Sequence, residues 1–308
     1  MKKGIIFGAL ISAAMICMSG CSAGFVNSSA VKYSNADKYT AGDREITDKI
    51  DELDIEWPTG TVNVSTSDNR TVSIKETTKN EIEDKYKVHS WAEGSTLHIR
   101  FCKSGERCDE DKTLDISVPK DIEFKDINVD CSSADVTFEG LSSEKVSMDA
   151  SSGNMTYNGN ADSFSADTSS GNIGFSGKAS TISTDCSSGE VSIEQKGKSD
   201  SIDVDTSSGD INISAEHTDK LSVDSSSGDK VIRLAEMPSD TSIEASSGSV
   251  ELYLPENADF TAEIDTSSGD VDYDLPMTKK GDDTYICGSG TNELSIDTSS
   301  GNVKIMKY

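Results

Sequence analysis

Apolar and polar residues alternate along the C-terminal two-thirds of the chain, and the alternation recurs around one signature. In the copy from Ile202 to Ile213, apolar residues at every second position lead into Asp-Thr-Ser-Ser-Gly-Asp, and a second alternating run follows. Strict alternation over roughly four to eight residues is typical of a half-buried β-strand, because successive side chains of a strand point to opposite faces. Each copy therefore predicts a strand, a bend at Ser-Ser-Gly, a second strand and a polar turn.

The Ser-Ser-Gly signature recurs at a nearly constant spacing. Neighbouring copies lie 18 to 21 residues apart, except for one gap of 32 before the last, and a degenerate copy ends at Ala134. The full copies end at Gly153, Gly171, Gly189, Gly209, Gly228, Gly248, Gly269 and Gly301. Such a period is typical of a solenoid, in which equivalent strands of successive rungs pair in parallel. The predicted fold is an all-β, parallel β-solenoid of about 20-residue rungs, right-handed by the general rule for parallel crossovers.

The positions around the signature glycine predict what fills each rung. Positions −7, −5, +2 and +4 are apolar in most copies and are expected to form the core. Lys230 and Val231 look like a local insertion, after which Ile232 and Leu234 recover the pattern. The glycine itself is expected to supply a positive φ without a Cβ penalty. Position −3 also falls on the inward side and is small in every copy: Cys131, Ala150, Thr168, Cys186, Thr206, Ser225, Ala245, Thr266 and Thr298.

The start of the chain predicts export and lipid anchoring. Residues 1–20 hold Lys2 and Lys3, a short apolar run and small residues, which is typical of a secretory signal peptide. The end of this segment resembles a bacterial lipobox, in which the cysteine that follows, here Cys21, is diacylated and becomes the new N-terminus. An ordinary signal peptide with an incidental Cys21 is the alternative. The lipobox predicts an extracytoplasmic protein that is lipid-anchored to the cell membrane.

The remainder of the chain divides into three predicted parts. Residues 21–45 lack periodicity and are expected to form a flexible tether. Residues 46–125 hold strand signals without the repeat, and they predict an irregular β cap or small β subdomain. A cap is expected because the exposed end of a solenoid is a sheet edge that invites aggregation. Residues 126–308 form the repeat region.

Charge excludes one class of partner. The chain carries 28 Lys and Arg against 55 Asp and Glu, a net charge of −27, or −29 without Lys2 and Lys3. So acidic a protein is not expected to bind nucleic acid, and an anionic membrane would repel its body. The predicted contact with the membrane is therefore through the lipid anchor.

Cysteines outside the signal peptide fall into three groups. Cys102 and Cys108 flank a polar loop, and outside the cytosol such a pair predicts a disulfide. A metal site is the alternative, although no histidine lies nearby in sequence to complete one. Cys131 and Cys186 lie three rungs apart in the inward column, about 14 Å at the usual strand spacing, so they are expected to be free thiols. Cys287 has no evident partner.

One outward position is acidic in every copy. Position −4 is Asp130, Asp149, Asp167, Asp185, Asp205, Asp224, Glu244, Asp265 and Asp297. Two interpretations stay open: the column binds cations such as Ca²⁺, or each acid accepts hydrogen bonds from backbone N–H groups and serine hydroxyls at its own bend. The repeat differs from the Gly-Gly-x-Gly-x-Asp nonapeptide of calcium-binding β-rolls. Repulsion between stacked acids is also expected to raise their pKa values in the folded state.

The sequence does not predict an enzyme. The three histidines, His89, His98 and His217, are scattered, and no zinc, phosphate-binding or nucleophile-elbow motif is present. Parallel β-helix lyases and hydrolases need a few acids and bases that converge at one place, whereas the acids of this chain are spread over every rung.

The repeated Asp-Thr-Ser-Ser-Gly-Asp-Val motif resembles that of the bacterial "putative adhesin" family, a surface domain of unknown function built as a β-solenoid. Leu252-Tyr253-Leu254-Pro255-Glu256 and the final Gly288-Ser289-Gly290 with its Ser-Ser-Gly copy are similar too, and the resemblance covers about residues 46–308. It implies a cell-surface binding module without catalytic residues, with an unknown protein or glycan as ligand. The alternative is an envelope scaffold or stress-associated lipoprotein that binds a membrane protein or the cell wall.

Overall fold

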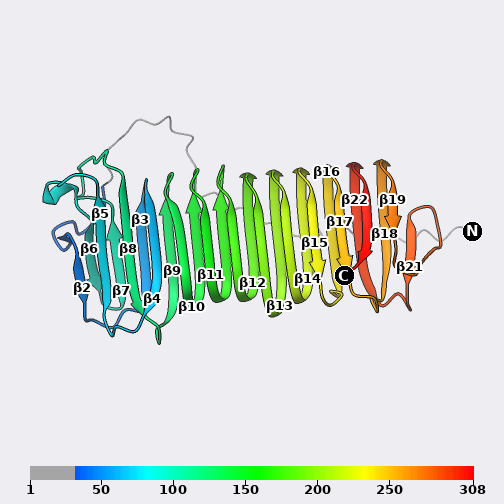
Figure 1. The fold of residues 1–308 in the computed structure, drawn as a ribbon, viewed down its shortest axis with the longest axis horizontal. Coiled ribbons are helices and arrows are strands. Elements are labelled where there is room, and N and C mark those ends of the chain that lie inside the picture. Colours follow the sequence, from blue (N-terminus) through cyan, green and yellow to red (C-terminus); the bar gives the residue numbers. More distant parts are fainter. Residues whose placement is uncertain (1–31) are drawn as a thin grey trace, which may run out of the picture.

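The computed structural model describes residues 32–308 and confirms an all-β solenoid. Its strands lie side by side across a long axis, so the protein is a narrow rod of successive rungs (Figure 1). The strand before each Ser-Ser-Gly bend lies in one sheet, which we call the pre-bend sheet, and the strand after it lies in the post-bend sheet. The apolar core fills the space between the two sheets.

The described part of the chain contains 23 strands and one short 3₁₀ helix. The N-terminal part holds β1 (Thr40–Ala41), β2 (Arg44–Ile46), β3 (Glu52–Trp57), β4 (Thr61–Ser67), β5 (Val72–Thr78), η1 (Asp84–Tyr86), β6 (His89–Glu93), β7 (Thr96–Arg100) and β8 (Lys112–Pro119). The central part holds β9 (Glu123–Cys131), β10 (Asp135–Ala150), β11 (Met155–Thr168), β12 (Ile173–Ser188), β13 (Val191–Ser208) and β14 (Ile211–Ser227). The C-terminal part holds β15 (Lys230–Leu234), β16 (Asp240–Ser247), β17 (Val250–Leu254), β18 (Phe260–Ser268), β19 (Val271–Tyr273), β20 (Met277–Lys279), β21 (Thr284–Cys287), β22 (Asn292–Ser300) and β23 (Val303–Lys307).

Each long central strand serves two rungs. β13, for example, begins after one bend in the post-bend sheet, passes through the turn and continues in the pre-bend sheet to the next bend. Parallel pairing keeps equivalent residues together, with Val204 beside Val223. The polar turn predicted between rungs is therefore a continuation of the strand. Register shifts there, such as the one between Gln195 and Lys198, absorb the unequal lengths of the repeats.

The alternation places columns of apolar side chains inside the rod. Ile202, Val204, Ile211 and Ile213 are each no more than 1% exposed, and their equivalents stack above and below them. Burial of such a side chain contributes about 1.5–3 kcal/mol. Three or four of them in most rungs of about 20 residues are what keeps so narrow a molecule folded.

Lys230 lies in register, so the insertion predicted at Lys230 and Val231 is wrong. Lys230 pairs with Ile211 in the preceding rung and with Val250 in the following one. Its side chain takes the inward position and is fully buried, and its ammonium donates to the carbonyl oxygen of Ser247 at 3.1 Å. Burial lowers the pKa of this lysine. The residue breaks the apolar pattern without breaking the register.

Close stacking of the rungs, more than the backbone φ angle, explains why the signature position is glycine. A Cβ on Gly209 would lie 1.8 Å from the carbonyl oxygen of Gly189, and every signature glycine meets a neighbouring rung in this way at 1.8 to 2.2 Å. Positive φ occurs at two of these glycines, Gly228 and Gly248. The expectation that the bend needs positive φ is therefore wrong for most rungs. The glycine is needed because a carbonyl group of the neighbouring rung occupies the place of its side chain.

The last rung of the chain is not the last rung of the rod. β22 lies between β16 and β18 in the pre-bend sheet, and β23 lies between β17 and β19 in the post-bend sheet (Figure 1). Beyond β18 the rod is closed by β21, which pairs antiparallel with β18, and by β20, which pairs antiparallel with β21.

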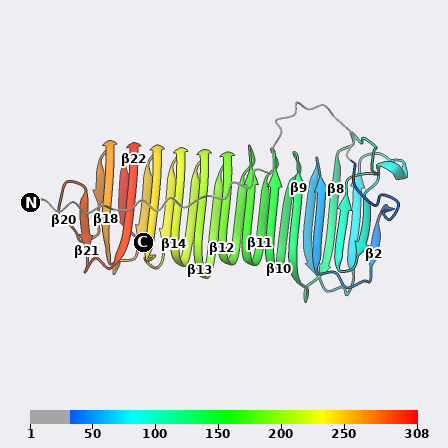
Figure 2. The same ribbon diagram turned by 180° about the vertical axis from the view of Figure 1, so that it is seen from behind.

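The N-terminal end uses the same arrangement. β3 lies between β7 and β9, and β4 lies between β8 and β10, although β7 and β8 come later in the chain than β3 and β4 (Figure 2). Antiparallel strands again close the end: β6 pairs with β7, and β5 pairs with β8. The irregular N-terminal β cap is thus confirmed, and a second cap that was not predicted lies at the other end.

The chain joins the cap earlier than predicted. β1 pairs with β6, β2 pairs with β5, and the hydroxyl of Tyr33 donates to the carbonyl of Cys102 at 2.9 Å. The tether predicted over 21–45 is therefore wrong for its described part, because strands of two or three residues leave no periodic signal. The rest of that tether, the signal peptide and Cys21 lie outside the described residues. Between residues 32 and 308, no helix has the length and apolar character needed to cross a membrane.

Candidate functional site

The nine acids at position −4 form one column on the outer surface of the pre-bend sheet. Each pairs in register with an equivalent acid of the neighbouring rung, about 4.8 Å away. The last two exchange places relative to the chain because β22 is inserted. This column, which we call the acid ladder, runs in the order Asp130, Asp149, Asp167, Asp185, Asp205, Asp224, Glu244, Asp297 and Asp265.

A buried arginine closes the N-terminal end of the acid ladder. Glu56 pairs with Asp130, and Arg100 pairs with Glu56 on the next strand. Arg100 is 7% exposed, and its guanidinium lies 2.6 Å from Asp54 and 3.2 Å from Glu56. Burial alone would raise the pKa of Asp54, but hydrogen bonds from Arg100 and His98 lower it overall. Among the ion pairs of residues 32–308, none includes an acid of the ladder itself.

Crowding raises the pKa of several ladder acids. Partial loss of hydration is the larger cause, and repulsion from neighbouring acids adds to it. The pKa of Asp167 and that of Asp205 rise to about 6, and the pKa values of Asp130 and Asp149 rise as well. The predicted direction is confirmed at these four acids. Repulsion, the cause predicted from the sequence, is the smaller of the two causes.

The hydrogen bonds expected at the acid ladder are made by a neighbouring column instead. Within the described residues no hydrogen bond reaches a ladder carboxylate. The side chain at position +1, just past the bend, accepts the backbone N–H of its equivalent in the next rung: Asn154 N donates to Asp135 Oδ1 at 3.0 Å, and Glu190 N to Asn172 Oδ1 at 2.8 Å. Four more rungs repeat this bond. The interpretation that each ladder acid is held by hydrogen bonds at its own bend is therefore wrong.

The acid ladder does not assemble a set of metal ligands. In the part of the chain that the structure describes, no group of three or more His, Cys, Asp and Glu side chains could hold a metal ion. Each rung contributes one ladder carboxylate, and Ca²⁺ takes roughly six to eight oxygen ligands. The outward neighbours in the same sheet are mostly serines, such as Ser147, Ser165 and Ser183. The column is an extended anionic surface with no preformed cation cage.

An aromatic group lies beside Arg100 on the same face. Trp91 stacks on His98 with ring centroids 5.5 Å apart, and Tyr39 contacts both rings. His98 Nδ1 lies 2.5 Å from Asp54, and its Nε2 lies 3.7 Å from Glu93. Both ring nitrogens thus face carboxylates, and no hydroxyl or thiol of residues 32–308 is hydrogen-bonded to this ring. These contacts anchor the N-terminal segment to the cap. They include no nucleophile that the histidine could activate as a base.

Tyr33 fixes the same segment to the cap. Its backbone N–H donates to Ser104 Oγ at 3.1 Å, and its ring lies 4.6 Å from that of Tyr39. Burial raises the pKa of Tyr33 to about 12. The described chain therefore begins at the N-terminal end of the rod, over the outer side of the pre-bend sheet.

Cys102 and Cys108 are free thiols in the structure, so the disulfide predicted between them is absent from it. The buried Sγ of Cys102 donates to the carbonyl of Glu106 at 3.6 Å. Burial raises the pKa of this thiol, which disfavours the reactive thiolate.

The other described cysteines are buried free thiols. Cys131 and Cys186 occupy the inward column three rungs apart, as expected from the repeat. Cys287 lies in the C-terminal cap, where its Sγ donates to the carbonyl of Ala258 at 3.2 Å. Each thiol fills a small internal space, and none lies in a surface cleft.

Sequence reasoning missed a buried lysine in the N-terminal cap. Lys112 is 1% exposed, and its ammonium lies 2.8 Å from the carboxylate of Glu76 and 2.5 Å from the carbonyl oxygen of Phe101. It also donates to the carbonyl of Tyr86 and lies over the ring of Phe101. The alternation of β8 places Lys112 on the inward side with Leu114 and Ile116, but the charge of a lysine argues against burial there. The ammonium of Lys112 donates hydrogen bonds to carbonyl groups where the loop from β7 to β8 crosses the end of the core.

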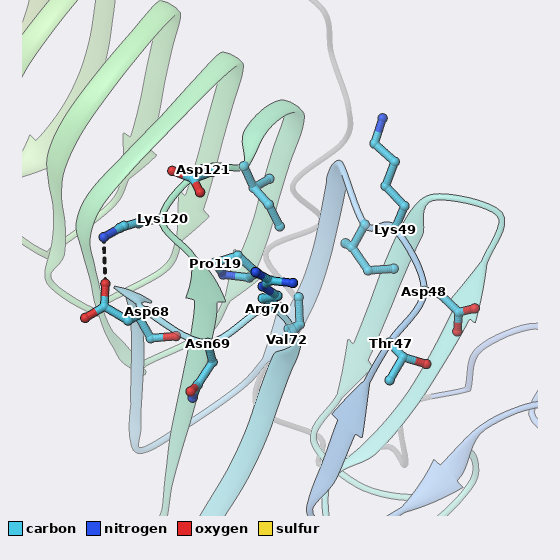
Figure 3. A pocket seen from close by; sticks show the side chains of 13 residues that line it. Thr47, Asp48, Lys49, Asp68, Asn69, Arg70, Val72, Pro119, Lys120 and Asp121 are labelled. Carbon is cyan, nitrogen blue, oxygen red and sulfur yellow. Dashed lines mark hydrogen bonds and ion pairs between the residues drawn. The ribbon is translucent and has the colours of Figure 1, made fainter.

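A cleft in the cap was also missed. It lies where the turns that follow β2, β4 and β8 meet, and its volume is about 690 Å³. Figure 3 shows Arg70 near its centre, with Lys120 paired to Asp68 on one side and Asp48 on the other. The three turns are separated by up to 70 residues in sequence and have no common motif.

The family model described as Toastrack DUF4097 matches residues 50–306. The match spans every rung and most of both caps, with β1 and β2 lying before its start. The chain belongs to the Toastrack DUF4097 family. The Toastrack boundaries fall at the start of β3 and within β23, so they follow the whole rod and not the Ser-Ser-Gly copies alone. This confirms the resemblance stated from the repeat motifs.

Several solved structures are similar to this Toastrack chain. A "putative adhesin" from Bacteroides fragilis is 12% identical, with 85% of this chain and 95% of that chain covered and a TM-score of 0.37. A "putative adhesin" from Parabacteroides distasonis is 12% identical, with 90% and 99% covered and a TM-score of 0.39. A "putative cell adhesion protein" from Clostridium sporogenes is 13% identical, with 88% and 100% covered and a TM-score of 0.26. The chain matches no curated protein.

Proposed function

We propose that this protein is a non-enzymatic, lipid-anchored binding module of the cell surface, an adhesin that presents a long acidic rod. The observation that carries the proposal is the unbroken stack of the pre-bend sheet. Eleven strands from β7 to β18 pair in parallel, in register, which corresponds to about 48 Å of rod. A stiff rod with the same outer residues in every rung suits display and repeated contact with an extended partner.

The distribution of chemistry supports a binding role over a catalytic one. A catalytic site needs a nucleophile, a base and a stabilising group within hydrogen-bond reach of one another. In the described residues, the acids are spread along the rod, four of the five cysteines are buried and Cys108 is half-buried. His98 and His217 each have carboxylates at both ring nitrogens, so neither ring nitrogen is paired with a hydroxyl or thiol nucleophile.

The orientation of the rod follows from its attachment. The anchor predicted at Cys21 lies twelve residues before Tyr33, which is fixed to the N-terminal cap. In our proposal the cap end therefore faces the membrane and the C-terminal cap is the distal end. The acidic body is repelled by anionic lipid, which favours an upright rod over one that lies flat.

The anchor has a direct test. Cys21→Ala is expected to abolish incorporation of labelled fatty acid and to release the protein from the membrane fraction. Cys17→Ala, which changes a cysteine inside the signal peptide, is the matched control and is expected to leave both unchanged. Retention of Cys21→Ala in washed membranes would contradict lipid anchoring.

Exposure on intact cells separates a surface adhesin from an envelope scaffold. An amine reagent that does not cross membranes is expected to modify Lys178 and Lys198, two exposed lysines of the middle rungs, on intact cells. The modified peptides would be identified by mass spectrometry. Modification that occurs only after the envelope has been opened would contradict the adhesin proposal and favour the scaffold. The ligand itself, a protein or a glycan, is to be sought by binding of the purified chain to glycan and matrix-protein panels.

A further inference from the structure

The cleft of Figure 3 has the size and shape of a small-molecule site. Its walls are three turns of the N-terminal cap: Thr47 to Ile50 after β2, Ser67 to Arg70 after β4, and Pro119 to Ile122 after β8. Its volume of about 690 Å³ lies within the range of ligand pockets, roughly 300–1,000 Å³. All three turns follow strands of the cap, which bring them together around the cleft.

The floor of the cleft is apolar. Ile50 and Val72 are buried beneath it, and Pro119 and Ile122 are partly exposed at its side. Ile122 also packs against the core, which holds the third turn in place. A ligand with a short apolar portion would therefore bury that portion against the floor.

Arg70 is the unpaired cation of the cleft. Its guanidinium makes no hydrogen bond or ion pair with residues 32–308, in a protein with 55 acids against 28 basic residues. Lys120, by contrast, is paired with Asp68 at 2.7 Å. Arginine presents its N–H donors in a planar fork that matches a carboxylate or a phosphate in a bidentate manner. The cleft thus offers a free anion-binding group above an apolar floor.

Two carboxylates in the same cleft narrow the class of ligand. Asp48 and Asp121 lie on opposite sides of Arg70 in Figure 3, and neither makes an ion pair or side-chain hydrogen bond with the described residues. They would repel a simple anion such as phosphate. They would attract an ammonium group placed a few ångströms from the anion on Arg70. The complementary ligand carries both charges.

We propose that this cleft binds a small zwitterion of amino-acid or dipeptide size. Its carboxylate pairs with Arg70, its ammonium faces Asp48 or Asp121, and its short side chain rests on Val72 and Pro119. The inference deepens the proposed binding function by naming a ligand class for one end of the rod. A free amino acid or dipeptide carries both charges in one small molecule, whereas a protein terminus carries only one of them.

The test is calorimetric titration of the full chain with L-alanyl-L-alanine. The same dipeptide with an amidated carboxyl group, or with an acetylated amine, removes one charge at a time, and inorganic phosphate supplies the anion alone. The free dipeptide is expected to bind at least about tenfold more tightly than any of the three, which is about 1.4 kcal/mol.

Variants link the binding to the named residues. Arg70→Gln is expected to weaken binding of the dipeptide about tenfold or more, and Asp48→Asn with Asp121→Asn to remove the preference for the free amine. Arg233→Gln is the matched control, because Arg233 lies over the ring of Tyr253 in the post-bend sheet. All three changed cleft residues are exposed, so melting temperatures should stay at the wild-type value.

The results that would overturn the zwitterion site differ from those that would overturn the proposed surface function. Equal binding of the capped dipeptides, full affinity in Arg70→Gln, or phosphate that binds as tightly as the dipeptide would each overturn the zwitterion site. So would absence of binding at millimolar dipeptide. None of these results depends on lipid anchoring or on accessibility in cells, so the cleft can fail while the proposed surface function stands, and the reverse.

Discussion

The acid ladder should cost the protein stability at neutral pH, and removing two of its charges should recover part of that stability. Asp167 and Asp205 lie on either side of Asp185 in the column, and each has a pKa of about 6 in the folded protein. Substitution of both by asparagine keeps the shape of the side chains and removes the charges. The expected result is a more stable protein at pH 7.5.

The sign follows from proton binding. In the unfolded chain both carboxyl groups titrate at about 3.8, whereas in the folded chain they titrate at about 6. The folded state therefore holds protons that the unfolded state has already released between these two values, so stability falls as pH rises from about 4 to about 6. Below that window, protonated aspartate and asparagine are alike in charge, and the gain in the variant should disappear.

The magnitude must be reduced for solvent. A shift of about two pKa units corresponds formally to about 3 kcal/mol for each acid. Both side chains lie on the outer surface, where water and salt screen such interactions, so about 1 kcal/mol each is the reasonable expectation. The double variant should gain about 2 kcal/mol at pH 7.5, or about 3–4 °C in melting temperature for a chain of this size.

The assay is thermal unfolding followed by circular dichroism at a series of pH values from 4 to 8, in chelator and at constant ionic strength. Asp282→Asn with Asp283→Asn removes the same two charges from the exposed turn between β20 and β21. This control is expected to change melting temperature little and without a step between pH 4 and 6. Other acids of the protein also titrate in acid, so the difference between variant and wild type is the quantity to compare.

Two results would refute the reasoning. A ladder variant whose gain is the same at pH 4 and pH 7.5 would show that the charge of these acids is not responsible. A variant less stable than wild type at pH 7.5 would show that the carboxylates bind something favourable. A rise in wild-type melting temperature that is specific to millimolar Ca²⁺, and absent in NaCl of matched ionic strength, would identify that partner as a cation.

Three further changes test the rung geometry. Gly209→Ala should lower the free energy of unfolding in urea by about 2–4 kcal/mol, because its Cβ would meet a backbone carbonyl. Gly174→Ala should be tolerated, because the nearest atom to its Cβ lies at 3.6 Å. Equal losses in the two variants would contradict the stacking argument. Lys230→Ala should lower the free energy of unfolding by about 2–4 kcal/mol, because it leaves a cavity in addition to the unpaired carbonyl of Ser247, and Lys230→Met, which keeps most of the volume, by less than about 1.5 kcal/mol; equal losses would show that the ammonium, which both variants remove, matters more than the packing. Deletion of residues 292–308 should remove hydrogen-exchange protection from β18 and β21 but not from β13, and protection of β18 in the truncated chain would contradict the observed rung order.

The repeat pattern predicts the inside of the rod well because it is set by one local rule. Every second side chain of a strand points inward, so the sequence identifies the buried columns, the small column at position −3 and the outward acids without knowledge of which rungs touch. Lys230 shows the limit of the rule. The pattern assigns a charged residue outward or to an insertion, whereas a long side chain can enter the core and reach a carbonyl oxygen such as that of Ser247.

The order in which the rungs stack cannot be predicted from the alternation, because the Ser-Ser-Gly signatures are nearly alike. The copy ending at Gly301 fits beside the copy ending at Gly248 as well as beside that ending at Gly269, and the structure uses both contacts. The gap of 32 residues is the one sign in the sequence that the last copy is special. The ladder's hydrogen bonds were assigned to the wrong column for a related reason: alternation says which side a residue faces, not what it meets there. The cleft at Arg70 was missed because three turns without periodicity form it together.

The inserted terminal rungs give both ends of the rod a common physical property. In a solenoid stacked in chain order, the last rung has a neighbour on one side only and can fray from the chain end. β22 instead pairs with β16 on one side and with β18 on the other, and β3 pairs with β7 and β9. Detaching either rung therefore breaks two ladders of hydrogen bonds at once. The outermost strands, β1 and β2 at one end and β19 and β20 at the other, are only two or three residues long, which makes them poor templates for another rod. Both properties suit the surface role proposed above, since fraying would expose the rod to proteases and open edges would let neighbouring copies join end to end.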